Sequence, residues 1–398
     1  MAAMDVSTLF SLIGLFIIIG FIADIAFKKI GIPDLIVLVG LGLLVGPILG
    51  LIDVDYIRGS MHLISTLAIA IILFDGGLSF DIRSVISGAS RAVILALLGF
   101  ILSTISVTLF SILILNWDIH SGVLLGVIVS DTSSAVTIPI VTRLSTLNGR
   151  IASMLTLESV LTDVLVVVVG LTLIRIPVNL ASESIIWMLV RETVSCFSIG
   201  CFSGIIAGLI WSKILEAAYR EAYRDILTLS VALLLYGFVE ILGGSGPISA
   251  LSFGLTLGNT RLLKTCSRSE ASIGVDVRTF QSQISFLVRT FLFVSIGVVS
   301  VFDDIVIVVI GLAISIILII TRYLAVRVSL FKAPLIVKLK TRILTFMVGR
   351  GLAAASIASL ASYYRIPHSG EMYSLTVSII LFTVILSSIG AMIEKLSS

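Results

Sequence analysis

The chain has 398 residues, of which 58% are hydrophobic and 12% are charged, and its mean hydropathy is +1.22. This composition excludes a soluble globular protein and indicates a polytopic membrane protein, because each spanning helix needs about 20 mostly apolar residues. The formal net charge of +3 gives no reason to expect a nucleic-acid partner, because in a membrane protein the placement of the charges carries the information.

Uninterrupted apolar runs predict about 13 transmembrane helices. They cover about residues 8–27, 33–52, 61–79, 91–115, 121–143, 151–174, 185–211, 225–242, 246–258, 280–300, 304–328, 341–362 and 372–393. No gap is long enough for a soluble domain, so residues 1–398 are expected to form a single membrane domain. The first run is too long for the apolar region of a cleavable signal peptide and is expected to remain as helix 1.

Lys and Arg lie mostly on one side of this topology. Of the 26 such residues, nineteen fall in loops on that side, three lie at or within spans, and four fall on the other side. Those four are Arg58, Arg175, Arg191 and Arg365. Because cytoplasmic loops retain basic residues, the N-terminus is predicted to lie outside and the C-terminus in the cytoplasm.

Two predicted helices contain breaks. In helix 5, the segment SDTSS and the following Pro139 place Asp131 and several hydroxyl groups in mid-membrane, where such residues favour caps and turns. In helix 12, Gly349 and Gly351 flank Arg350. The odd offset of seven helices gives the two breaks opposite orientations, as inverted repeats require. Paired interrupted spans of this kind point to the binding site of a transporter.

Helix 6 carries two acidic residues at a depth where an ionised side chain costs at least about 2.5–3.5 kcal/mol. Positions four apart share a helix face, so Ser159 lies over Asp163 and Glu158 over Thr162. A hydroxyl beside a carboxylate suits an alkali cation or a proton. The other face, with Glu158, is expected to meet a basic side chain.

The remaining polar groups in the spans fit the same interpretation. Asp131, between Ser130 and Thr132, is expected to cap one half of helix 5 and to bind the ion. Arg350 is expected to neutralise the negative end of the corresponding half of helix 12. Asp75, in the segment LFDGGL near the inner end of helix 3, is expected to line the approach from the cytoplasm, although a hydrogen bond between helices would also explain it.

At these residues the chain resembles the monovalent cation/proton antiporter superfamily, in particular the NhaP-type sodium/proton exchangers of prokaryotes. The resemblance covers essentially the whole chain and rests on five motifs in the family's order and spacing. They are LFDGGL, SDTSSAVTIPIV, LESVLTDVL, TRYLAV and GRGLAAASIA. It implies an all-α polytopic membrane protein with inverted repeats and interrupted helices 5 and 12, the NhaA-like antiporter fold.

The resemblance also implies the ion site. It makes Asp163 the residue for which cation and proton compete, with Asp131 and Ser159 as partners that complete a Na+ site. Ser130 contributes at the break in helix 5. The residue after Asp131 is Thr132, where the family has Pro, so the shape of this break is expected to differ from the family's.

Three further residues are implied to support the site. Glu158 is expected to pair with an arginine, foremost Arg322 of helix 11, and Arg350 to stabilise the break in helix 12. Thr162 stands where electroneutral exchangers usually have Asn and electrogenic relatives have a second Asp. Because Thr cannot titrate, we predict one-for-one exchange, with the Thr162 hydroxyl donating a hydrogen bond to Glu158.

The implied function is exchange of Na+ or Li+ for H+ across a prokaryotic plasma membrane by alternating access, in the service of pH homeostasis. A core bundle, about residues 91–174 and 304–393, is expected to move against an interface bundle, about residues 8–79 and 185–300, which forms a homodimer. The expected partners are the cation, the proton, the lipid bilayer and a second copy of the chain. No cofactor and no enzymatic activity are expected.

Three alternatives stay open. A K+/H+ antiporter would have the same fold. A cation channel would need a filter of backbone carbonyls, and no TVGYG-like segment occurs. An intramembrane aspartyl protease would use Asp131 and Asp163, but the Gly-x-Gly-Asp pattern of that family is absent. Zinc binding and a disulfide framework are not expected, because Cys196, Cys201 and Cys266 have no metal-ligand spacing.

Overall fold

The computed structural model describes residues 6–30, 34–79, 82–143, 149–175, 184–217, 223–260, 275–299, 305–331 and 341–396. These residues form helices joined by short connections. Cys266 lies outside the described ranges. So do some of the nineteen basic loop residues counted above, namely Arg220, Arg261, Lys264, Arg268, Lys332, Lys338 and Lys340.

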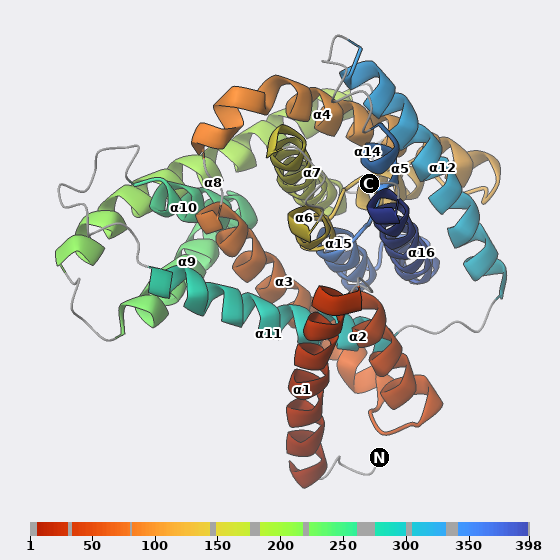
Figure 1. The fold of residues 1–398 in the computed structure, drawn as a ribbon, viewed down its shortest axis with the longest axis horizontal. Helices are drawn as coiled ribbons and strands as arrows, with labels where there is room; N and C mark the ends of the chain where they lie inside the picture. Colours follow the sequence, from red (N-terminus) through yellow and green to blue (C-terminus); the bar gives the residue numbers. More distant parts are fainter. Residues whose placement is uncertain are drawn as a thin grey trace. The chain divides into compact units, whose positions relative to one another are not determined.

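The helices follow the predicted spans closely (Figure 1). The first are α1 (Val6–Ile30), α2 (Asp34–Leu43) with a π-helical turn η1 (Leu44–Ile48), α3 (Val54–Ser79), α4 (Ile82–Leu113), α5 (Ile119–Ile128), α6 (Ser134–Arg143) and α7 (Gly149–Arg175). The others are α8 (Ser184–Ala217), α9 (Arg224–Ile241), α10 (Gly246–Gly258), α11 (Val275–Val299), α12 (Ile305–Ser329), α14 (Thr341–Phe346), α15 (Leu352–Tyr363) and α16 (Ser369–Leu396).

Among the described helices, seven are long and apolar enough to cross a membrane, and several shorter apolar helices accompany them. Predicted spans 5 and 12 are each made of two short helices, α5 with α6 and α14 with α15. Non-helical backbone separates the halves at residues 129–133 and 347–351. The prediction of an all-α polytopic fold with two interrupted spans is therefore confirmed.

Local hydrogen bonds explain where α5 begins and ends. The Asp118 carboxylate caps its N-terminus by accepting from the Ser121 N–H at 2.9 Å. Burial acts to raise the pKa of Asp118, but the hydrogen bonds from Ser121 hold that pKa below its usual value. At the other end, the Ser130 hydroxyl donates to the Val127 carbonyl at 2.7 Å and competes with the helical pattern. The break therefore begins where the first polar residue follows the apolar run.

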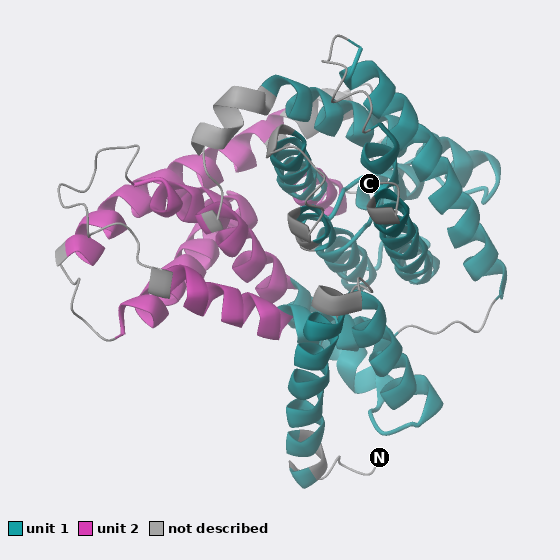
Figure 2. Cartoon of the chain, in the orientation of Figure 1, with its two compact units in different colours: residues 1–65, 88–166, 289–398 teal, residues 66–87, 167–288 magenta. Residues whose placement is uncertain are grey.

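The chain divides into two compact units (Figure 2). Unit 1 comprises residues 1–65, 88–166 and 289–398, and unit 2 comprises residues 66–87 and 167–288. Within unit 1, α16 packs against α12, α14 and α15, so both breaks belong to this unit. The core and interface bundles expected from the sequence concern which helices move together, and that division stays a prediction.

In unit 2, α10 packs against α8 and α9. Glu240 is half-buried: it accepts from Arg175 at 2.6 Å and from the Gly246 N–H at the start of α10 at 2.8 Å. A carboxylate is favoured at that position because free N–H groups point out of a helix N-terminus. Asp75 lies partly buried in the unit 2 part of α3, and its role on the cytoplasmic approach stays a prediction.

In unit 1, glycines let α2 and α11 touch backbone to backbone. A Cβ on Gly42 would lie 2.8 Å from the Gly297 Cα, closer than side chains approach in real structures. An ion pair of 3.3 Å between Asp34 and Arg289 joins the same two helices. Small residues at helix contacts are the usual means of close packing in membranes.

The Gly42→Ala variant is expected to unfold at a lower temperature than the wild type, because overpacking costs about 1–3 kcal/mol. Gly40, two residues earlier in α2, supplies the matched control, since a Cβ there meets nothing within 4 Å. The Gly40→Ala variant should be neutral or stabilised by up to about 0.5–1 kcal/mol. Thermal unfolding in detergent, followed by tryptophan fluorescence, measures both. Equal effects of the two substitutions would contradict the close contact.

Candidate functional site

The two breaks lie against each other in unit 1. The Ser133 N–H donates to the Gly349 carbonyl at 2.8 Å, and a side chain on Gly351 would collide with the Ser133 hydroxyl. Inside a bilayer, irregular backbone persists only where protein or water satisfies its polar groups. Direct bonding between the breaks meets that requirement and brings residues from distant parts of the sequence together.

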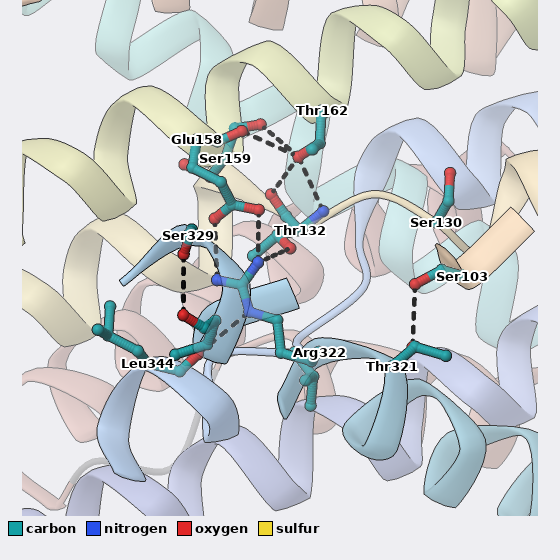
Figure 3. A network of polar contacts seen from close by, with 12 residues as sticks. Ser103, Ser130, Thr132, Glu158, Ser159, Thr162, Thr321, Arg322, Ser329 and Leu344 are labelled. Carbon is teal, nitrogen blue, oxygen red and sulfur yellow. Dashed lines mark hydrogen bonds and ion pairs between the residues drawn. The ribbon is translucent and has the colours of Figure 1, made fainter. Parts of the chain in front are cut away.

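Glu158 and Arg322 form a bidentate ion pair beside this crossing (Figure 3). The oxygen–nitrogen distances are 2.7 and 3.0 Å, and the Glu158 and Arg322 side chains are 0% and 3% exposed. The Arg322 Nε also donates to the Leu344 carbonyl in the last turn of α14 at 3.1 Å. The pair therefore links α7, α12 and α14, and Arg322 is the partner that the resemblance implied for Glu158.

Arg350 binds the opposite break from the one expected. Its guanidinium donates to the Ser130 carbonyl at 3.4 Å and lies 3.5 Å from the Thr132 hydroxyl, so it neutralises the C-terminal end of α5. The expectation that it serves the first half of helix 12 is wrong. The C-terminal end of α14, the first half of helix 12, is bound by Arg322. The crossing of the two breaks directs the Arg350 side chain toward α5 instead.

Thr162 holds the break in helix 5 in place. Its hydroxyl oxygen accepts from the Thr132 N–H at 3.0 Å. Its single proton is shared among the main-chain carbonyls of Glu158, Ser159 and Thr132, at 3.1, 3.0 and 3.4 Å. The sequence predicted donation to Glu158, and the structure directs it to the main chain of that residue rather than to the carboxylate.

The Thr162→Val variant is expected to lose about 1–3 kcal/mol of unfolding free energy, because the buried Thr132 N–H loses its acceptor while the side-chain shape is kept. Thr162→Ser keeps the hydroxyl and is the matched control. Thermal unfolding in detergent compares the two variants. A Thr162→Val protein as stable as Thr162→Ser would show that the hydroxyl does not hold the break.

Asp163 is half-buried and is held by a residue that the sequence analysis missed. Its Oδ2 accepts from the Ser134 hydroxyl at 2.5 Å and from the Ser134 N–H at 3.2 Å. Ser134 is the first residue of α6, and its place directly after the polar break was the available signal, because carboxylates favour helix N-termini. Ser159, expected beside Asp163, donates its hydroxyl to the Thr156 carbonyl at 3.0 Å, which leaves its lone pairs for other partners.

Asp131 is 0% exposed, and neither of its carboxylate oxygens has a hydrogen-bond partner of good geometry within the described ranges. The Asp131 carboxylate is attracted electrostatically by Arg350 and repelled by Glu158, and it interacts directly with Asp163. Buried carboxylates are almost always hydrogen-bonded. The Gly351 main chain lies close enough to interact with the Asp131 carboxylate, but no hydrogen bond of good geometry forms in the described part of the chain. The site therefore brings together two interacting carboxylates.

A family model described as "Sodium/hydrogen exchanger, transmembrane" matches residues 13–393. The chain belongs to the sodium/hydrogen exchanger family. It is therefore a multi-pass membrane protein of a transporter family, and the resemblance drawn from the sequence motifs is confirmed. The carboxylates and arginines described above lie where the two interrupted helices of this exchanger-family chain cross.

Two curated relatives of this exchanger-family chain are named as antiporters of different cations. The K(+)/H(+) antiporter NhaP2 from Shewanella sp. (strain ANA-3) is 32% identical over 265 residues, covering 66% of this chain and 45% of the relative. The probable Na(+)/H(+) antiporter 2 from Methanocaldococcus jannaschii is 30% identical over 292 residues, covering 69% of this chain and 65% of the relative. The matched part spans less than half the length of the NhaP2 relative.

Solved structures show the same exchanger-family fold. The sodium proton antiporter MjNhaP1 from Methanocaldococcus jannaschii at pH 8 matches with a TM-score of 0.81 over 97% of both chains, at 23% sequence identity. A second structure of that protein matches with a TM-score of 0.76. The likeness extends over nearly the whole of both chains.

Proposed function

We propose that this chain exchanges a monovalent cation, Na+ or Li+, for a proton across the membrane, one for one. The charge balance of the buried site carries the proposal. The groups that interact electrostatically there are three carboxylates, Asp131, Glu158 and Asp163, and two guanidinium groups, Arg322 and Arg350. When all five are ionised the cluster holds one negative charge, and a single cation or a single proton neutralises it.

Competition between the two ions follows from this balance. A buried cluster with a net charge is costly to move through an apolar barrier, whereas a neutral one is not. We therefore infer that the site changes sides only when it holds one cation or one proton. Asp163 is the group for which they compete, because it is half-buried and Ser134 donates only to its Oδ2.

The remaining ligands are inferred from proximity. Asp131 offers two oxygens without hydrogen-bond donors of good geometry in the described part of the chain. Ser159 offers oxygen lone pairs one turn before Asp163, and the Ser130 carbonyl lies at the break. Hard oxygen ligands of this kind suit alkali cations. Thr162 contributes no charge, which supports electroneutral rather than electrogenic exchange.

K+/H+ exchange is the second candidate, because relatives at 32% identity are named K(+)/H(+) antiporters. The site chemistry is the same for both functions, since one K+ neutralises the cluster as one Na+ does. Only the size of the oxygen cage distinguishes them. The choice of Na+ or Li+ as the cation is therefore the part of the proposal that ion replacement tests most directly.

The test is dissipation of a preset pH gradient in proteoliposomes on addition of Na+, Li+ or K+, with and without a clamped membrane potential. Signals with Na+ and Li+ that do not change under the clamp support the proposal. A signal with K+ alone moves the assignment to K+/H+ exchange. A signal that depends on the clamp overturns the one-for-one stoichiometry, and cation flux without proton movement overturns antiport.

We further propose that the chain works as a homodimer in a prokaryotic plasma membrane, with its N-terminus outside and its C-terminus in the cytoplasm. Sodium extrusion and pH homeostasis are the roles that such exchange serves. Alternating access would move residues 91–174 and 304–393 against residues 8–79 and 185–300, with Asp75 lining the cytoplasmic approach. Reporter fusions at the two ends of the chain and cross-linking in intact membranes test the orientation and the dimer.

A further inference from the structure

Ser134 occupies one of the two oxygens of the Asp163 carboxylate. Its hydroxyl donates to the Oδ2 atom at 2.5 Å, and its main-chain N–H donates to the same atom at 3.2 Å. An O–H donor at such a distance from a carboxylate oxygen forms a short, charge-assisted hydrogen bond. Because Ser134 directs both of its donors to Oδ2, the Oδ1 atom is the oxygen that Asp163 can turn toward a bound ion.

The position of Ser134 is fixed by the two residues just before it. The Thr132 N–H donates to the Thr162 hydroxyl at 3.0 Å (Figure 3). The Ser133 N–H donates to the Gly349 carbonyl at 2.8 Å. Each of these two residues is thus anchored to a different neighbouring segment. Ser134 therefore cannot move away from the carboxylate without disturbing the crossing of the two breaks.

Other oxygens at the site remain available to an ion. The Ser159 hydroxyl donates its proton to the Thr156 carbonyl at 3.0 Å, which leaves the Ser159 lone pairs for other partners. Asp131 has no hydrogen-bond donor of good geometry on either carboxylate oxygen within the described ranges. Ser134 has the opposite effect, because its proton occupies an oxygen that could otherwise bind the ion.

The number of oxygens that a carboxylate offers affects which cation is preferred. Larger cations take more oxygen ligands at longer distances and tolerate flexible cages, whereas smaller cations take fewer ligands in a stricter geometry. This rule separates Ca2+ from Mg2+ and rests on ion size, so it applies to the alkali cations as well. A fixed carboxylate with one available oxygen therefore suits Li+ or Na+, and K+ gains more from a second oxygen.

We propose that Ser134 is a specificity-determining residue, which favours Na+ and Li+ over K+ by keeping the Oδ2 atom of Asp163 out of the cation's coordination shell. The inference rests on the proposed exchange function and names the residue that sets its cation preference. Ser134 acts through the carboxylate that it holds, so it is a positioning residue.

The Ser134→Ala variant tests this role, because it removes the hydroxyl and keeps the main-chain N–H at the start of α6. The measurement is the KM for each cation in the pH-gradient assay in proteoliposomes. The ratio of the KM for K+ to the KM for Na+ should fall about fivefold, which corresponds to about 1 kcal/mol, the contribution of one hydrogen bond. A change in how strongly the proton competes alters the KM of every cation alike, so the ratio isolates the cation preference.

Two further variants serve as controls. Ser134→Thr keeps the hydroxyl and should keep the wild-type ratio. Ser315→Ala removes a hydroxyl elsewhere in unit 1, which donates only to the Gly311 carbonyl of its own helix at 2.7 Å, and should also keep that ratio. An unchanged ratio in Ser134→Ala, whatever its rate, would overturn the proposal, as would an equal shift in Ser315→Ala. A wild type that prefers K+ would also overturn it, because Ser134 would then be present without the preference.

Cation-dependent melting temperatures in detergent separate this inference from the proposed function. A bound cation stabilises the folded protein, so the rise in Tm with each cation reports binding without transport. If the wild type shows no exchange but Na+ and Li+ raise its Tm more than K+, only the exchange function is wrong, and Ser134→Ala should still narrow the difference. If the wild type exchanges and Ser134→Ala keeps the full difference, only the role of Ser134 is wrong. A wild type that neither exchanges nor responds to any cation overturns both.

Discussion

The Asp163→Asn variant is expected to lose cation-coupled proton movement. The substitution removes the negative charge that one cation or one proton neutralises, and an amide cannot bind a proton at working pH. A charge in mid-membrane is worth about 2.5–3.5 kcal/mol on insertion scales, so the loss should reach roughly 100-fold or more. The measurement is the pH-gradient assay in proteoliposomes with Na+, Li+ and K+.

Two controls make the Asp163→Asn result specific. The Asn amide oxygen can still accept from Ser134, so the melting temperature should stay near that of the wild type. Asp163→Glu keeps a titratable carboxylate and should retain proton coupling at a reduced rate. Cation-coupled proton movement by Asp163→Asn at the wild-type rate would show that the ions do not compete at this residue.

The second large effect concerns the buried ion pair. The Glu158→Gln variant leaves Arg322 charged and without its partner, and the Arg322→Gln variant leaves Glu158 charged and without its partner. Breaking a buried ion pair in this way costs about 3–5 kcal/mol of unfolding free energy. The double variant Glu158→Gln/Arg322→Gln removes both charges and should be more stable than either single variant. Thermal unfolding of the four proteins forms a double-mutant cycle and gives the coupling between the two residues.

The same four proteins test the charge balance. Glu158→Gln leaves the ionised cluster neutral, and Arg322→Gln leaves it with two negative charges, so both single variants should fail to exchange one cation for one proton. The double variant restores one negative charge and should regain part of the activity. Stability that recovers without any activity would mean that Glu158 has a direct part in ion binding beyond its charge.

The breaks and the carboxylates could be predicted from the sequence because each is a local departure from apolar composition. SDTSS cannot continue a lipid-embedded helix without cost, and neither can Gly349-Arg350-Gly351. Asp131, Glu158 and Asp163 are conspicuous for the same reason. The count of spans followed from run lengths alone, since short charged loops separate nearly every pair of helices.

The partners of these residues could not be predicted as well, because they depend on how the two breaks cross. Ser134 looks like any hydroxyl residue of the break until α6 begins at that residue and directs its N–H toward Asp163. Arg350 was assigned to its own span, whereas the crossing turns it toward Ser130. Thr162 was expected to bind a carboxylate and binds the main chain. The local sequence pattern carries no information about such contacts between residues that are far apart in the sequence.

The crossing of the two breaks also constrains biosynthesis. Arg350 binds the carbonyl of Ser130, which precedes it by 220 residues. At a synthesis rate of about 5–20 residues per second, roughly 10–40 s pass between the emergence of the two residues. During that interval the open backbone of the first break lacks its partners, and hydrocarbon would not tolerate it. The early helices must therefore wait in a hydrated or chaperoned setting until the last two spans have been made.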